Sequence, residues 1–422
     1  MNKPAGILSH FGGIGRALSI YNYRVYWTGQ LLMVQGFWIQ KIAAGFLIYD
    51  MTNSPAWLGA VGFGYHIPIL IFGPFAGAIA DRLGLRFVAI VMSLLGVAIS
   101  MAMAVLIWTD VMTPLLLVLL MTLQGTQFAF EFPARQSLIG RLVDRQNLSA
   151  AVAVNSTTFH SSGFTGPLIG GLLLQHYGAG SGFAANAFCM LWMTTALLRI
   201  HPPVGAAQRL AERRLQSSLL QNFKEGFAYA LQHPHLKFLF LGTFFVALLV
   251  RPYLDFMPGF AIDVFNRGEQ GLANMLAASG VGAFCFAFFL ALHGATRGLT
   301  RILSVGLITT CLALIGFALT DIYNVGLVAL FFVGGFLVAA SISAQTLVQH
   351  CLADEFRGRV ISIYVSISVG VPAIGTLAMG WIAESLGLQM TLVGITVVAL
   401  IAFIPLVVIF LKRDKEIEAE PV

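Results

Sequence analysis

Long apolar stretches, separated by short polar ones, dominate the hydropathy pattern of this chain. Each of twelve stretches is long enough to cross about 30 Å of hydrocarbon as a helix. They cover residues 26–50, 56–80, 87–108, 113–132, 149–174, 182–200, 237–258, 270–292, 302–320, 324–350, 360–384 and 388–411. The pattern therefore predicts an all-α membrane protein with twelve transmembrane helices.

Lysine and arginine gather in the loops on one side of these spans. An even number of spans places both termini on that side, and among the basic residues only Arg267 lies in a loop on the other side. Because basic loops stay cytoplasmic, we expect both termini in the cytoplasm of a bacterial cell and the spans in its inner membrane. The same loops can meet anionic lipid head groups, so the net charge of +6 needs no nucleic-acid partner.

Composition excludes a soluble protein and gives no sign of an enzyme. Hydrophobic residues make up 58% of the chain and charged residues 10%, against about 45–50% and about 25% in soluble domains. The sequence has no phosphate-binding loop of the ATPase type, no His-Glu-x-x-His helix and no Cys-x-x-Cys pair. We therefore expect no cofactor, no metal centre and no built-in ATPase.

A polar stretch near the middle divides the spans into two sets of six. It predicts an N-terminal bundle over 1–200, a cytoplasmic linker over 201–236 with an amphipathic helix at 219–231, and a C-terminal bundle with its tail over 237–422. Short matches recur about half a chain apart, such as Asp81-Arg82 with Thr296-Arg297. Repeats of this kind predict two pseudo-symmetric six-helix bundles.

A charged turn between the second and third spans is the most distinctive local motif. Its marked positions are Gly77, Asp81, Arg82, Gly84 and Arg86. Gly77 would let the second span approach a neighbour closely, and the two arginines could reach an acid on an adjacent helix, for which Glu131 is the candidate. Such a network would form a gate at the inner face, whereas a simpler interpretation is a plain cytoplasmic turn.

The fifth span carries a second motif, with glycine and proline in close succession: Gly166, Pro167, Gly170 and Gly171. Glycine and proline together bend a helix and allow close packing against a partner helix. The motif predicts a close-packed bend, with or without a part in the transport cycle.

These motifs resemble those of a known group of transporters. The spacing of the charged turn is similar to the loop 2–3 signature of the major facilitator superfamily, and the fifth-span motif resembles an element of its antiporters. The blocks at 23–30, 132–136, which includes Arg135, and 354–359 are similar to the drug-efflux and siderophore-exporter branch. The resemblance implies alternating access, export in exchange for protons, and a place for Arg135 among the gating residues.

Two cations inside spans are candidates for binding cargo. Lys41 lies deep in the first span and Arg251 at a comparable depth in the seventh, and Gln30 and Phe37 share a helix face with Lys41. Intramembrane charges usually mark a transport path. The pair predicts a cationic patch for an anionic or chelating cargo. The alternative is that Arg251 pairs with Asp255 at i+4 while Lys41 extends toward the interface.

Proton coupling needs a group that can titrate inside the membrane. His66, His160 and Asp255 are the candidates, because each lies within a span. Either histidine could equally be a hydrogen-bonded packing residue.

Taken with the resemblance, these features predict a monomeric exporter of a small amphipathic molecule, siderophore-like or drug-like, with protons and membrane lipids as its other partners. Three alternatives stay open. They are proton-coupled uptake of a small molecule or metal chelate, lipid flipping, and a non-transporting sensor on a transporter scaffold.

Overall fold

The computed structural model describes residues 12–200, 219–293, 297–352 and 356–418, and within these ranges it contains helices and no strand. The first half comprises α1 (Gly12–Ser19), α2 (Tyr21–Thr52), α3 (Pro55–Leu83), α4 (Leu85–Trp108), α5 (Pro114–Leu142), α6 (Arg145–Tyr177) and α7 (Ala179–Arg199). The second half comprises α9 (Leu219–Gln232), α10 (Leu236–Phe245), η2 (Val246–Val250), α11 (Tyr253–Gly259), η3 (Phe260–Val264), α12 (Gly268–His293), α13 (Leu299–Leu319), α14 (Tyr323–His350), α15 (Arg357–Gly370), α16 (Pro372–Leu386), α17 (Leu388–Lys412) and α18 (Asp414–Ile417).

Eleven helical segments of the described chain are long and apolar enough to cross a membrane. The expected fifth span is α6, which is 33 residues long but more polar than the others. Several of its polar side chains, including Asn155, Thr158 and Ser162, are buried, and α6 packs against α2 and α12. The chain is therefore a multi-pass, all-α membrane protein, as its hydropathy pattern predicted.

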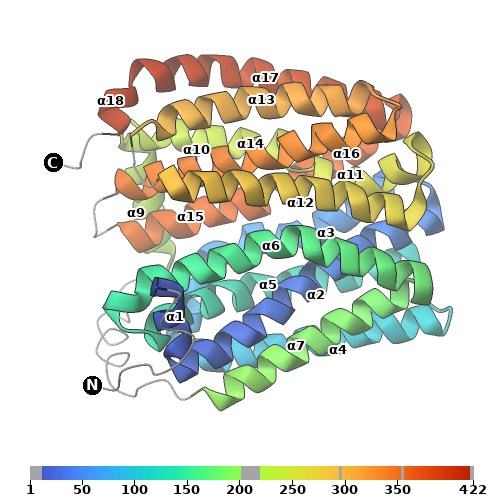
Figure 1. Ribbon diagram of the computed structural model, residues 1–422, viewed down its shortest axis with the longest axis horizontal. Helices are drawn as coiled ribbons and strands as arrows, with labels where there is room; N and C mark the ends of the chain where they lie inside the picture. The colour runs from blue at the N-terminus through green and yellow to red at the C-terminus, as the bar shows by residue number, and fades with distance from the viewer. Residues whose placement is uncertain (1–11, 201–218, 294–296, 353–355, 419–422) are drawn as a thin grey trace.

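The helices form two bundles that lie side by side, with α2 to α7 below and α10 to α17 above in Figure 1. The bundles meet where α3 packs against α15 and α16, and where α6 packs against α12. The short helices α1, α9 and α18 gather at one end of the long helices, called here the near side. The opposite end is called the far side.

The outer surface of the bundles is apolar. Leu115, Leu119 and Leu123 follow one another at four-residue spacing along α5, and each is more than half exposed. Ile401 and Ile404, three residues apart on α17, are also more than half exposed. A soluble protein rarely exposes such continuous apolar surface, and these faces agree with a multi-pass membrane protein.

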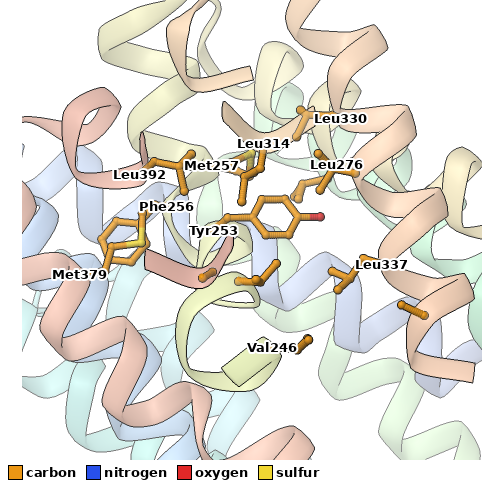
Figure 2. Packing of buried hydrophobic residues seen from close by; sticks show 14 of the residues in the cluster. Val246, Tyr253, Phe256, Met257, Leu276, Leu314, Leu330, Leu337, Met379 and Leu392 are labelled. Atoms are coloured by element: carbon orange, nitrogen blue, oxygen red, sulfur yellow. The ribbon is translucent and has the colours of Figure 1, made fainter. Parts of the chain in front are cut away.

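The seventh span is irregular and anchors the second bundle. Between α10 and α11, and again after α11, the helix widens into the π turns η2 and η3. Figure 2 shows the ring of Tyr253, at the start of α11, among Leu276, Leu314 and Met257. The Tyr253 hydroxyl lies 3.0 Å from Ser279 Oγ of α12. These contacts hold α11, the segment between the two π turns, in the core of the second bundle.

The amphipathic helix expected at 219–231 is α9, and it is attached to the second bundle. Arg359 Nη1 of α15 lies 2.6 Å from Glu225 Oε2, and the rings of Tyr229 and Phe356 stack at 4.4 Å. Residues 201–218 of the expected linker lie outside the described residues, as do positions 354 and 355 of the 354–359 block. The division into these three segments remains a prediction.

Candidate transport site and gates

Three ionisable side chains from both bundles meet midway along the spans. Lys41 Nζ of α2 lies 3.1 Å from Asp255 Oδ1 of α11, and His66 Nε2 of α3 lies 3.9 Å from the other carboxylate oxygen. Lys41 and Asp255 keep 22% and 14% of their side-chain surface exposed. The cluster is therefore an ion pair that joins the two bundles, and two of the three expected proton-coupling candidates belong to it.

The alternative pairing of Arg251 with Asp255 is wrong, and the reason is the break in the seventh span. The Arg251 amide donates five residues back, to Val246 O at 2.9 Å. After Pro252 the ladder tightens, and the Asp255 amide donates three residues back at 2.9 Å. The i+4 rule holds for a regular α-helix, so it does not apply across this turn.

The expected cationic patch of Lys41 and Arg251 is also not what the structure shows. Lys41 is already paired with Asp255, whereas Arg251 lines a pocket inside the second bundle together with Thr243, Ser341 and Tyr364. Both cations do lie within electrostatic range of His66. Arg251 therefore remains a cargo candidate, but separately from Lys41.

Half-buried aromatic side chains adjoin the ion cluster and form an aromatic wall made of Phe37, Tyr65, Phe128 and Phe132. The Phe37 ring lies 6.4 Å from Tyr65 and 5.9 Å from Phe128, and Phe128 stacks on Phe132 at 5.2 Å. Tyr65 also meets the His66 ring edge-on at 5.2 Å. The sequence predicted only Phe37 here; the i+4 spacing of Phe128 and Phe132 was the signal for the rest.

Gln30 was expected to face cargo, but it is buried inside the first bundle. Its amide oxygen accepts a hydrogen bond from Arg135, whose guanidinium also pairs with Glu131 at 2.6 Å within α5. Glu131 has no exposed surface and Gln30 keeps 2%. This places Gln30 in a buried polar network of the first bundle, which borders the aromatic wall where Arg135 lies 5.7 Å from the centre of the Phe132 ring.

The same contacts separate Glu131 from the charged turn. Arg86 instead donates from Nε and Nη2 to the carbonyl oxygens of Leu197 and Leu198, both at 2.8 Å, at the end of α7. Asp81 Oδ1 pairs with Arg141 Nη2 at 3.3 Å, and Arg82 is exposed. The expected partnership of Glu131 with these arginines is wrong, because its carboxylate is held by Arg135 in the bundle core.

The two glycines of the turn differ in what they do. Gly84 ends α3 with φ of +98°, a conformation that favours glycine. A methyl group added at Gly77 would meet no atom within 4 Å. The predicted close approach at Gly77 is therefore absent from this structure.

The glycines of the fifth span do pack closely, as expected. A Cβ at Gly166 would lie 2.6 Å from Trp38 Cβ, and one at Gly170 would lie 3.2 Å from Ile39 Cα of α2. Gly171 faces Ala273 of α12, and Pro167 lies inside a continuous α6. These small residues therefore let α6 lie against both bundles at once.

His160, on the same helix, is not part of the ion cluster. Its ring lies 5.8 Å from that of its neighbour Phe159, and in the described part of the chain no carboxylate forms an ion pair with it. Nor do the described residues contain any group of three or more histidines, cysteines or acids that could hold a metal.

Hydrogen bonds also join the bundles on the far side. Tyr49, near the end of α2, donates to Asp263 of η3. Glu384, near the end of α16, accepts from Ser54 Oγ at 2.8 Å and from the Ala56 amide at 3.1 Å. Sequence reasoning missed all of these, because none of them lies in a recognisable motif.

Two bundles of this kind, with a polar cluster between them, are the architecture of a secondary transporter of the major facilitator superfamily. Residues 16–422 match the family described as transmembrane secretion effector, so the chain belongs to that family.

Curated relatives cover nearly the whole chain at low identity. The staphyloferrin A transporter of Staphylococcus aureus is 23% identical over 94% of this chain and 98% of its own length. The multidrug efflux pump Tap of Mycolicibacterium fortuitum is 24% identical over 90% and 93%, and macrolide efflux protein A of Streptococcus pyogenes is 23% identical over 86% and 89%. The chain is thus similar to members of the efflux and siderophore branch.

Solved structures share the fold. A bacterial homolog of the human lysosomal transporter Spinster superposes with a TM-score of 0.72 at 16% identity, covering 95% of this chain and 99% of that one. The nucleoside transporter NupG gives a TM-score of 0.69 at 14% identity, over 92% and 99%.

Proposed function

We propose that this transporter exports a small amphipathic molecule by alternating access, in exchange for protons carried by Asp255. The observation that supports this most directly is the ion pair between Lys41 and Asp255 across the two bundles, with His66 on the second carboxylate oxygen. An acid at this position contributes to holding the bundles together, and its protonation state changes that contribution. The names of the relatives support export as the direction.

Exchange requires that the proton and the cargo exclude each other. Ionised Asp255 accepts charge-assisted hydrogen bonds from Lys41 and from a donor group on the cargo. A proton on Asp255 removes its negative charge and weakens both interactions, so proton loading and cargo loading compete at one carboxylate. The groups facing Asp255 are Lys41 of α2, with Tyr65 and His66 of α3.

Uptake by symport would require the opposite coupling. A cargo anion that takes Lys41 away from Asp255 leaves the carboxylate without its cation, and proton binding is then favoured. Proton and cargo would bind together and move in the same direction. The sign of the proton movement therefore separates exchange from symport.

The aromatic wall supports an amphipathic cargo. Phe37, Tyr65 and Phe128 are each partly exposed beside the ion pair, so a ring or alkyl group of the cargo can be buried against them while a polar group reaches Asp255. We further propose that the near side is cytoplasmic, that the chain lies in a bacterial inner membrane and that it works as a monomer. The basic loops of the near side support the orientation.

The test uses proteoliposomes with an acidic lumen and a trapped pH-sensitive dye. Catecholate chelators, carboxylate chelators and cationic drugs are added outside, one class at a time. Exchange predicts that a transported probe raises the lumen pH, and that Asp255→Asn abolishes the rise. The matched control is Asp321→Asn, an exposed acid that accepts a hydrogen bond from Gln389 at 3.1 Å.

Other outcomes would overturn the proposal in distinct ways. Acidification of the lumen on adding a probe would identify symport. Movement of fluorescent phospholipid between leaflets without a pH change would identify lipid flipping. If no probe changes the lumen pH and no phospholipid moves, although the protein is folded and inserted in the membrane, a sensor role would be favoured.

A further inference from the structure

Arg251 is the unusual charge of the second bundle. In the part of the chain that the structure describes, no carboxylate pairs with its guanidinium and no side chain hydrogen-bonds to it, although it is partly buried. The nearby acid, Asp255, is taken by Lys41. A partly buried guanidinium without a counterion is costly in a membrane, so this position points to a ligand that brings the negative charge.

The surroundings of Arg251 form a pocket with a polar end and an apolar body. Hydroxyl groups of Thr243, Ser341, Tyr364 and Ser368 line it with Arg251. Tyr364 lies within electrostatic range of Arg251. The hydroxyls of Thr243 and Ser368 already donate to the carbonyl oxygens of Leu239 and Tyr364, which leaves Ser341 and Tyr364 as the hydroxyl donors for an oxyanion. A guanidinium matches a carboxylate in planar, two-point geometry.

The remaining walls are apolar. Leu303 and Leu307 come from α13, Val246 from η2 and Phe410 from α17. An inorganic anion would gain nothing from these side chains, whereas an alkyl or aryl group attached to the anion would be buried against them. The pocket therefore fits an organic acid better than a free inorganic ion.

We infer that the Arg251 pocket is a carboxylate subsite, which binds the acidic arm of an amphipathic cargo within the second bundle while Lys41 stays with Asp255. This inference rests on the proposed function for its transport role, but the binding itself does not. The sequence had grouped the two cations, and this inference gives them separate roles. Arg251 would bind the carboxylate of the cargo, and Lys41 would pair with Asp255, which carries the proton.

The test measures binding to the purified full chain in lipid nanodiscs by isothermal calorimetry, without any gradient. The probes are 4-phenylbutyrate and its amide, which differ only in the carboxylate. Wild type is expected to prefer the acid by about tenfold, the difference made by one charge-assisted interaction. Arg251→Gln should remove that preference and Arg251→Lys should keep part of it. Lys41→Met should leave it unchanged.

A second variant covers the case in which Arg251→Gln fails to fold. Ser341→Leu puts an apolar branch into the pocket and keeps Arg251, and it should weaken binding of the acid by about tenfold as well. A preference that survives Arg251→Gln, or that disappears in Lys41→Met, would overturn the subsite, as would equal binding of acid and amide by wild type. The experiment measures binding and no proton movement. Its result therefore does not depend on whether the exchange proposal is correct.

Discussion

Tyr49 of α2 donates a hydrogen bond to the carboxylate of Asp263 in η3, and so ties the first span to the seventh at the far side. Tyr49 keeps 1% of its surface exposed, whereas Asp263 is exposed, so the bond lies at the edge of the bundle core. Glu384 adds a second tie, where it accepts hydrogen bonds at the start of α3. Opening of the far side during alternating access must break both ties.

The first prediction concerns this bond. Tyr49→Phe removes the hydroxyl and keeps the ring, and a hydrogen bond to a charged group contributes about 1.5–3 kcal/mol. We expect the ratio of far-side-open to far-side-closed molecules to rise by at least about tenfold. Spin labels at Asp110→Cys and Asn324→Cys, exposed positions on the two bundles, would report this as a longer distance in pulsed electron resonance.

Tyr177→Phe is the matched control, because Tyr177 also lies at the far side but is 72% exposed. All spin-labelled proteins are made in a parent protein in which the four native cysteines are replaced. The distance distribution of Tyr177→Phe should equal that of this parent. An unchanged distribution in Tyr49→Phe would mean that the bond does not limit opening.

The buried pair of α5 leads to the second prediction. Arg135→Met leaves the Glu131 carboxylate in the core without its cation, and breaking a buried pair in this way costs about 3–5 kcal/mol. The double variant Glu131→Leu with Arg135→Met removes both charges and should recover most of that loss. Thermal unfolding in detergent gives the ranking. Arg82→Met, at an exposed position, should stay close to wild type.

The spans were predictable from the sequence because each one is a local property of 20 or more residues. Even α6, with its buried polar side chains, was found by its length. The ion cluster was not predictable, because Lys41, His66 and Asp255 come together only when α2, α3 and α11 pack. The predicted pairing of Arg251 with Asp255 was wrong for a local reason, because no pattern in the sequence indicates the π turn η2.

The third prediction concerns the near side, where α18 covers Cys351. Cys351 Sγ lies 3.7 Å from Ile417 O, and Ile417 is 1% exposed. Burial raises the pKa of the Cys351 thiol to about 11. Because only the thiolate reacts, its alkylation at pH 7.5 should be about two orders of magnitude slower than that of a free cysteine, and should quicken as pH rises toward the pKa.

Ile417→Asp should release α18 and bring the Cys351 rate toward that of a free thiol. Lys415→Asp is the control, because Lys415 is exposed on the same short helix. Labelling would be followed by mass spectrometry of the Cys351 peptide. Equal rates in both variants would show that α18 does not protect this thiol.

The last prediction compares two glycines that the sequence had treated alike. Gly166→Ala places a methyl group 2.6 Å from Trp38 Cβ, so α6 must move away from α2, and overpacking of this kind costs about 1–3 kcal/mol. Gly77→Ala meets no atom within 4 Å, and alanine is the better helix former by about 1 kcal/mol. In detergent, Gly166→Ala should therefore unfold at a lower temperature than wild type and Gly77→Ala at the same or a higher one. Transport by Gly77→Ala then tells whether the close approach expected there belongs to another state of the cycle: normal exchange would dismiss it, whereas lost exchange in a fully stable protein would place the contact in a conformation that this structure does not contain.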